Sequence, residues 1–406
     1  MNDWVEYLIP GGVAAAVTMA LTFGVRWAAV RFSIVVLPDE RRVHERPTPT
    51  VGGVAMFVGF LSAMAVASQL AAFRQVFQSN SEPLGIVVAA GVIFAVGTAD
   101  DLREMSPPAK MSGQVLAGTL LYLFGVAMLF FRIPFVGTTL VLSPDLSPLF
   151  TVAWVVVIAN AVNFIDGLDG LAAGIIAIAS GAFFVYSHQF LAFQGFGANV
   201  GPLIAIVTCG ICVGFLPHNF HPAKIFMGDA GAMLLGLLMA ASTMSVVGES
   251  DVGSPGRTFF TFAPILIPFF ILGIPLLDTT WAIVRRASRR ASPAVADKNH
   301  LHHRLMRLGH GQTRAVLILW AWTALLSGIV LWPVLTRHNS IAAPAGVGAL
   351  AILLVTVFAR GRRAADAAAI PPPPPAAAPR PRLSQLAHSS PQPGRHRRRA
   401  PADHRS

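Results

Sequence analysis

The chain has 406 residues, of which 54% are hydrophobic and only 12% are charged, and its formal net charge is +11. Soluble domains carry roughly 25% charged residues, so this composition argues against a soluble globule, and its apolar content excludes disorder over most of the length. The apolar residues form continuous runs, such as 90–96 and 234–239, whereas an outer-membrane β-barrel would alternate apolar and polar residues. The sequence therefore predicts an all-α, polytopic integral membrane protein.

Apolar stretches of about 20 residues predict eleven transmembrane helices. They lie near residues 8–30, 51–72, 84–99, 111–131, 148–165, 170–187, 200–217, 230–247, 259–281, 315–336 and 341–359. An odd number of spans puts the two termini on opposite sides of the membrane.

Lys and Arg residues are distributed unevenly between the two sets of loops. With the N-terminus outside, the inside loops hold 15 of them, the outside loops hold 4, and the C-terminal tail holds ten more arginines. Because cytoplasmic loops carry the excess of basic residues, we expect the N-terminus outside and the C-terminus in the cytoplasm. Anionic lipid heads and phosphate substrates then explain the +11 charge, and no nucleic-acid partner is needed.

Residues 360–406 differ in composition from the rest of the chain. This segment contains five consecutive prolines at 371–375, many alanines and the arginines of 395–399. Such a composition cannot bury a core. We therefore expect a transmembrane catalytic domain over 1–359 and a disordered cytoplasmic tail over 360–406.

Seven of the 19 acidic residues fall at the inner ends of spans or in inside loops of this topology. They are Asp100, Asp101, Asp166, Asp169, Asp229, Asp278 and Asp297. Ionised groups near a membrane core are costly and usually functional. Their position predicts chemistry at the cytoplasmic interface.

Asp100 and Asp101 end the third predicted span, and Lys110 follows at the start of the fourth. Two adjacent carboxylates repel each other, so the pair favours a cation or a shared proton. The positive charge of Lys110 could pair either with these aspartates or with a phosphate. A merely solvated helix end is the alternative.

Asn160, Asn163, Asp166 and Asp169 recur every three residues around the turn between the fifth and sixth spans. A spacing of three keeps neighbours near one helix face, and the glycines that follow both aspartates break the span. A hydrogen-bonded network between helices is the structural alternative to a ligand site.

Asp229 lies in the string Met227-Gly228-Asp229, just before the eighth predicted span. An N-cap is a plausible structural role for it there. The positive end of the same helix would also favour a phosphate nearby.

Two further inside loops carry basic and imidazole groups. His300, His302 and His303 stand beside Arg304 and could bind a metal or a diphosphate. The first inside loop holds Arg46, followed by two glycines at 52–53 that let the backbone approach a ligand or another helix closely. Together the five loops predict a Mg²⁺ site, in which one or two carboxylates bind the ion with substrate phosphates and waters.

These strings resemble the polyprenyl-phosphate N-acetylhexosamine-1-phosphate transferase superfamily. The matching strings stand in the family's order at Pro47–Gly53, Asp100-Asp101 with Lys110, Asn163–Ala172, Met227–Asp229 and His300–His303. The form His300–Leu305 is similar to the GlcNAc-1-phosphate transferases that start O-antigen, teichoic-acid or arabinogalactan-linker synthesis. The peptidoglycan branch, which transfers phospho-MurNAc-pentapeptide, more usually has three consecutive histidines followed by Phe, and it is the alternative. One departure is Ala232, where many members have Ser.

The resemblance implies that a polyprenyl phosphate attacks the β-phosphate of a UDP-N-acetylhexosamine, here UDP-GlcNAc. UMP leaves and a polyprenyl-diphosphate-sugar forms, as the first membrane step of a cell-envelope polysaccharide. The implied setting is the plasma membrane, with the active site on its cytoplasmic face, Mg²⁺ as cofactor, Mn²⁺ as its substitute, and a homodimer as one possible assembly.

The resemblance also implies roles for individual residues. Asp229 and Asp166 would bind the metal, and Asp100 or Asp101 would orient the lipid phosphate and deprotonate it where needed. The expected catalytic residues are Asp100, Asp101, Asp166, Lys110, His302 and His303. The expected substrate-binding residues are Arg46, Asn163, Asp169, His300 and Arg304.

A cation or proton transporter is the rival from a different class. It would place its carboxylates near the midplane of the membrane, often in broken helices of paired repeats. A CDP-alcohol phosphotransferase would need an Arg after a D-G-x-x-A string, and none follows Asp166-Gly167 in that pattern.

Overall fold

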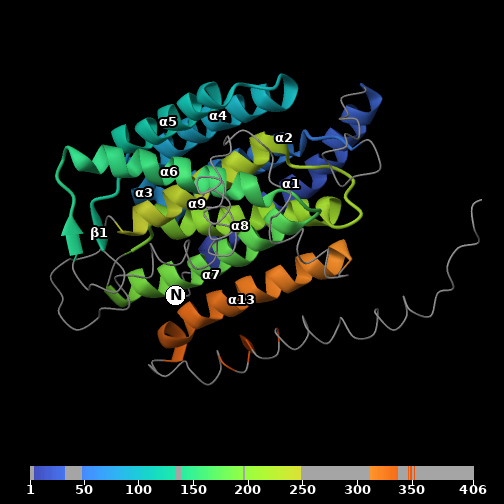
Figure 1. Ribbon diagram of the computed structural model, residues 1–406. Helices are drawn as coiled ribbons and strands as arrows, with labels where there is room; N and C mark the ends of the chain where they lie inside the picture. The colour runs from blue at the N-terminus through green and yellow to red at the C-terminus, as the bar shows by residue number, and fades with distance from the viewer. Residues whose placement is uncertain are drawn as a thin grey trace, which may run out of the picture. The chain divides into compact units, whose positions relative to one another are not determined.

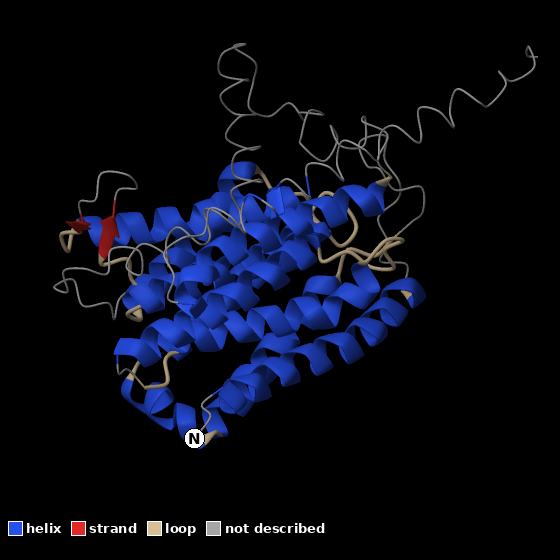
Figure 2. Ribbon diagram, turned by 90° about the horizontal axis from the view of Figure 1, so that it is seen from below, coloured by secondary structure: helices blue, strands red, loops and turns tan. Residues whose placement is uncertain are grey.

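The structure is a computed structural model that describes residues 4–32, 48–132, 139–194, 197–247 and 311–336, together with four isolated positions between 346 and 352. Within these ranges the chain is almost entirely helical (Figures 1 and 2). The first half contains α1 (Trp4–Arg31), α2 (Gly52–Gln69), the 3-10 turn η1 (Ala71–Phe73), α3 (Arg74–Ser79), α4 (Glu82–Leu102) and α5 (Pro107–Leu123). After the short strands β1 (Phe130–Arg132) and β2 (Thr139–Val141) follow α6 (Leu146–Ile165), α7 (Leu171–Gln194), α8 (Val200–Asn219), α9 (Gly228–Val247) and α13 (Gln312–Thr336).

Most of the described helices agree with the predicted spans. Nine of the eleven predicted spans correspond to a described helix, and the two near 259–281 and 341–359 fall outside the continuous described ranges. Eight helices in the described part of the chain are long and apolar enough to cross a membrane. This agrees with an all-α, multi-pass membrane protein, whereas the count of eleven and the orientation stay predictions.

The fourth predicted span, 111–131, is wrong at its C-terminal end, because α5 already stops at Leu123. Gly125 has φ +97°, a left-handed conformation that glycine adopts without strain. Its N–H donates to Tyr122 O at 3.0 Å, and Val126 N donates to Leu121 O at 2.9 Å. These two hydrogen bonds form a Schellman motif, which ends the helix although the sequence stays apolar. The chain continues into an antiparallel ribbon of β1 and β2.

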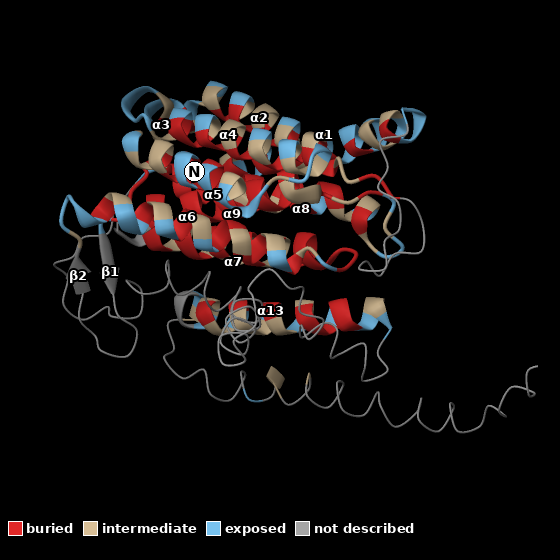
Figure 3. Ribbon diagram, turned by 45° about the horizontal axis from the view of Figure 1, so that its top comes forward, coloured by how far each residue is buried: buried red, intermediate tan, exposed pale blue. Residues whose placement is uncertain are grey.

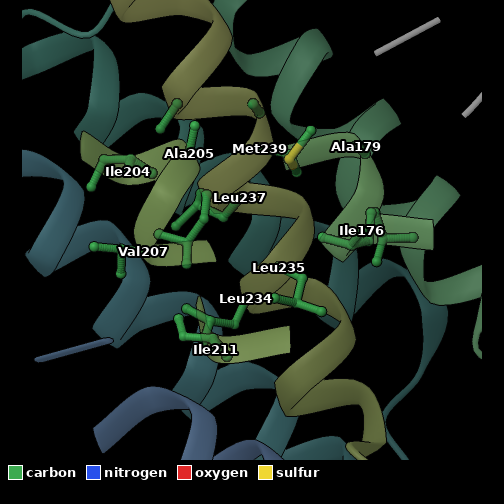
Figure 4. Packing of buried hydrophobic residues seen from close by; sticks show 14 of the residues in the cluster. Ile176, Ala179, Ile204, Ala205, Val207, Ile211, Leu234, Leu235, Leu237 and Met239 are labelled. Atoms are coloured by element: carbon green, nitrogen blue, oxygen red, sulfur yellow. The ribbon is translucent and has the colours of Figure 1, made fainter. Parts of the chain in front are cut away.

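Helix α9 forms the centre of the described bundle and packs against α2, α4, α6 and α8. In its most apolar stretch 94% of the residues are buried, against 28% in α1 (Figure 3). Figure 4 shows Leu234, Leu235 and Leu237 of α9 among side chains of α7 and α8. A helix that is apolar on all sides is one that neighbours surround, so the sequence of α9 fits its central position.

Small residues bring α4 and α9 into close contact near the end of α4. A Cβ atom added to Gly97 would lie 2.6 Å from the backbone nitrogen of Ala230. Glycine at such a crossing lets two helix backbones approach each other closely. The contact brings Asp100 and Asp101, which lie within the next turn of α4, to the first turn of α9.

We predict that Gly97→Ala separates α4 from α9, lowering both thermal stability and activity. Forcing a methyl group into a filled contact costs about 1–3 kcal/mol. Gly91→Ala is the matched control on the same helix, because its nearest neighbour, Phe57 Cζ, would be 4.0 Å from the new Cβ. Thermal unfolding of the purified protein in detergent measures both, and equal midpoints would contradict the prediction.

Candidate active site

The candidate active site lies where three helices end and three others begin. The C-terminal ends of α4, α6 and α8 are followed by short connections to the N-terminal ends of α5, α7 and α9. Asp100 and Asp101 are in the last turn of α4, and Asp166 directly follows α6. Asp229 is in the first turn of α9. Strings that are far apart in the sequence are therefore brought together.

Lys110 of α5 joins two of the carboxylates. Its Nζ contacts Asp229 Oδ2, and it donates to Asp100 Oδ2 at 3.1 Å. The other oxygen of Asp100 accepts a hydrogen bond from Met105 N at 2.7 Å, which closes the turn between α4 and α5. The side chains of Lys110, Asp100 and Asp229 are 17%, 16% and 29% exposed, so the ion pairs are partly shielded from water and still accessible to a ligand.

Asn163 of α6 completes the contacts of Asp229. With its amide oriented to suit the hydrogen bonds, Asn163 donates to Asp229 Oδ1 at 3.2 Å and accepts from Lys110 Nζ at 3.2 Å. Asp229 thus faces a cation with one oxygen and an amide with the other. Asn163 is part of this cluster, and its predicted contact with substrate stays a prediction.

Asp101 caps the N-terminus of α9. Its Oδ1 accepts from Asp229 N at 2.8 Å, and its Oδ2 accepts from Ala230 N at 3.0 Å. The first N–H groups of a helix lack partners within the helix, and a negative charge there is stabilising. The sequence left open whether Asp229 caps this helix. The described cap is instead a carboxylate from α4, which leaves the Asp229 side chain directed at Lys110 and Asn163.

The glycine pair at residues 52–53 packs against the backbone of the connection between α8 and α9. Gly52 N and Gly53 N donate to the carbonyls of Phe226 and Met227 at 2.9 Å each, and Phe226 N donates to Pro49 O at 2.8 Å. Gly228, the next residue, has φ +68°, and a Cβ there would lie 2.7 Å from Asp101 Oδ1. The close approach expected of these glycines holds the turn before Asp229 in place.

Asp166 is the half-buried C-cap of α6. Burial, and to a smaller extent the negative charges of Asp101 and Asp169, together raise the pKa of its carboxyl to about 7. Asp166 therefore lies close to the carboxylate that caps α9. A cation bound beside Asp166 would favour the ionised form, because opposite charges stabilise each other.

Asp169 is buried, with 3% of its surface exposed, and it ties the start of α7 to the loop after α8. Its Oδ2 accepts from Ala223 N at 3.0 Å and pairs with His221 Nδ1 at 2.7 Å. Asn219 Oδ1 accepts from Gly170 N at 3.0 Å in the same turn. Sequence reasoning did not select Asn219 or His221. The available signal was their place at the inner end of a span, only a few residues before Lys224.

The carboxylates suit a partly hydrated divalent cation. No group of three or more His, Cys, Asp or Glu side chains in the described ranges is arranged to hold a metal ion. Mg²⁺ needs only one or two carboxylates when waters and phosphates supply its other ligands. The ammonium group of Lys110 between Asp100 and Asp229 marks a position that attracts positive charge. The residues of this site therefore fit Mg²⁺ as part of a shell that substrate would complete.

The predicted basic and imidazole groups lie outside the described residues. These are Arg46, His300, His302, His303 and Arg304. Their convergence on the aspartate cluster stays a prediction.

We predict that Asp101→Asn destabilises the protein and impairs activity, because it weakens the cap at the start of α9. Asn offers a single oxygen, so one N–H at the start of α9 loses its acceptor, at a cost of about 1–3 kcal/mol for a buried donor. Asp145→Asn is the control, because Asp145 precedes α6, is exposed and makes no side-chain cap. If Asp101→Asn and Asp145→Asn had the same unfolding midpoint and the same turnover, the capping role of Asp101 would be contradicted.

Comparison with known proteins finds one matching family and several similar proteins. Residues 83–247 match the model of the family "Glycosyl transferase family 4". The chain is 40% identical to the decaprenyl-phosphate N-acetylglucosaminephosphotransferase of Mycolicibacterium smegmatis over 366 residues, which are 89% of this chain and 90% of that protein. It is 34% identical to a probable undecaprenyl-phosphate N-acetylglucosaminyl 1-phosphate transferase of Bacillus subtilis, covering 76% of this chain and 79% of that protein. The phospho-N-acetylmuramoyl-pentapeptide-transferase of Mycolicibacterium smegmatis is 31% identical, over 79% of this chain and 95% of that protein.

Proposed function

Because the chain belongs to glycosyl transferase family 4, we propose that it transfers N-acetylglucosamine 1-phosphate from UDP-GlcNAc to a polyprenyl phosphate. The relatives named for this reaction are 40% and 34% identical to the chain, whereas the pentapeptide-transferase relative is 31% identical. The observation that carries the proposal is the contact of Lys110 with both Asp100 and Asp229. This contact forms one charged cluster at the end of the helices.

In the proposed reaction a phosphate oxygen of the lipid attacks the β-phosphorus of UDP-GlcNAc. The bond to the UMP oxygen breaks, and polyprenyl-diphosphate-GlcNAc forms. Phosphoryl transfer needs positioning and neutralisation of charge more than covalent participation by the protein. A phosphate monoester with a second pKa near 6 is largely ionised at neutral pH, so a strong general base is unnecessary.

The residues of the cluster divide these tasks. Asp229 and Asp166 would hold Mg²⁺, which supplies positive charge to the diphosphate when bound. Lys110 neutralises a phosphate oxygen, and Asp100 restrains Lys110 through the ion pair at 3.1 Å and orients the lipid phosphate. Asp101 is a positioning residue, because its oxygens hold the backbone of Asp229 and Ala230. We keep His302 and His303 as further partners of the phosphates.

The proposed setting is the inner face of the plasma membrane. The excess of Lys and Arg in one set of loops supports a cytoplasmic site, eleven spans and an outside N-terminus. A lipid acceptor with a charged head also requires a site at the membrane surface. The exposed apolar side chains Met111 and Leu116 on α5, close to Lys110 in sequence, suit contact with a lipid.

We predict that Asp229→Asn lowers turnover at least 100-fold, because an uncharged amide neutralises neither Lys110 nor a metal. The assay incubates purified protein with radiolabelled UDP-GlcNAc, polyprenyl phosphate and Mg²⁺, and it measures lipid-linked sugar and UMP. Asp145→Asn controls for loss of an exposed carboxylate and should keep full turnover. A near-normal rate for Asp229→Asn at saturating Mg²⁺ would contradict the metal role of Asp229. If the unaltered chain formed no lipid-linked sugar, the proposed function itself would be refuted.

A substrate panel tests the branch of the family. We expect UDP-GlcNAc to be used at least tenfold faster than UDP-MurNAc-pentapeptide when both are saturating. The reverse preference would assign the chain to the peptidoglycan branch. Cation flux through vesicles that contain the protein, without any lipid product, would instead support the transporter.

A further inference from the structure

A second polar layer lies one helical turn behind the charged cluster. Lys110, Asn163 and Asp229 come from α5, α6 and α9. Residues three or four positions along a helix lie on the same face. The corresponding residues one turn deeper in the bundle are Gln114 on α5, Asn160 on α6 and Met233 on α9.

These three deeper residues contact one another. Asn160 Nδ2 donates to Gln114 Oε1 at 2.6 Å, and Gln114 Nε2 lies 3.5 Å from Asn160 Oδ1. Gln114 Nε2 also donates to Met233 Sδ at 3.3 Å, and Asn160 Nδ2 donates to Val156 O at 2.8 Å. The layer thus links the same three helices as the charged cluster, through two facing amides and a thioether.

Gln114 is the one polar side chain among the buried residues of α5. These residues are Gly113, Gln114, Ala117, Gly118 and Leu121. Gly113 faces Val96 of α4, and Gly118 faces Val152 of α6, so both neighbours meet glycines. Small residues let the neighbouring helices approach α5 closely.

Gln114 adds directional hydrogen bonds to this close packing. It is 1% exposed, and a buried amide without partners is costly. A small rotation of α5 about its axis would separate the two amides and break the hydrogen bond between Asn160 Nδ2 and Gln114 Oε1. The same rotation would carry Lys110 away from Asp229, since Lys110 and Gln114 share one face of α5.

We propose that Gln114 and Asn160 are positioning residues for the transfer reaction. Their paired amides fix α5 against α6, so that Lys110 and Asn163 reach the same carboxylate of Asp229. Neither side chain needs to touch substrate. The proposal rests on the proposed function, because its main consequence is a change in turnover.

The first test separates hydrogen bonding from packing. Gln114→Leu removes the amide and keeps a similar volume. We expect at least a tenfold lower kcat, a KM for UDP-GlcNAc within threefold, and a fall in the unfolding midpoint no larger than that of the control variant Thr243→Val. Thr243→Val is the matched control, because it removes another buried hydrogen bond between α6 and α9, Trp154 Nε1 to Thr243 Oγ1 at 3.1 Å, far along both helices from the cluster. Its kcat should stay within twofold.

The second test is rescue by exchange. Gln114→Asn and Asn160→Gln each change the length of one amide side chain, and each should lower kcat. The double variant keeps the summed length and both amides, so its kcat should recover to within about threefold of the unaltered chain. If the single variants instead lowered kcat through separate structural defects, the two losses would combine in the double variant and kcat would not recover.

The outcomes separate this proposal from the proposed function. An active unaltered chain with a Gln114→Leu variant of undiminished kcat overturns the positioning role alone. A double variant that is slower than either single variant overturns it as well, as does a Thr243→Val variant with an equal loss of kcat. An unaltered chain that forms no lipid-linked sugar overturns the function, and the positioning role with it.

Discussion

The hydrogen bonds between Asp101 and the start of α9 fix the geometry on which the site depends. The central helix begins at Gly228 with backbone N–H groups that need acceptors, and a carboxylate from α4 supplies them. Only a glycine at position 97 lets α4 come close enough for this contact. Because the cap comes from another helix, the Asp229 side chain is directed at Lys110 and Asn163.

Charge balance explains the remaining features of the site. Carboxylates that gather at one end of a bundle repel one another. Most of those in the described residues have a cation or a hydrogen-bond donor that offsets their negative charge. Asp100 and Asp229 share Lys110, Asp101 faces backbone N–H groups, and Asp169 faces His221 and Ala223 N. Asp166 has a pKa raised to about 7, because burial and its acidic neighbours disfavour its charge. A cation bound beside Asp166 would stabilise its ionised form, which is consistent with the proposed magnesium ion.

The polar layer of Gln114 and Asn160 shows how a site built on helix ends can keep its geometry. Helix ends are displaced by small rotations, and α5 packs closely against its neighbours through glycines. A paired amide one turn behind the charges resists that rotation without competing for substrate. Specific hydrogen bonds thus add direction to packing that small residues make close.

The sequence by itself determined the helices, the segments that carry the site and the family, because apolar runs and short polar strings are local patterns. It predicted nine described spans and selected Asp100, Lys110, Asn163 and Asp229. It could not predict the early end of α5, which depends on the left-handed Gly125, nor that Asp101 rather than Asp229 caps α9. The roles of Asn219, His221 and Gln114 were equally hidden. Such partners are separated by tens of residues, and only tertiary packing decides which polar groups meet, since every buried donor must find an acceptor within reach.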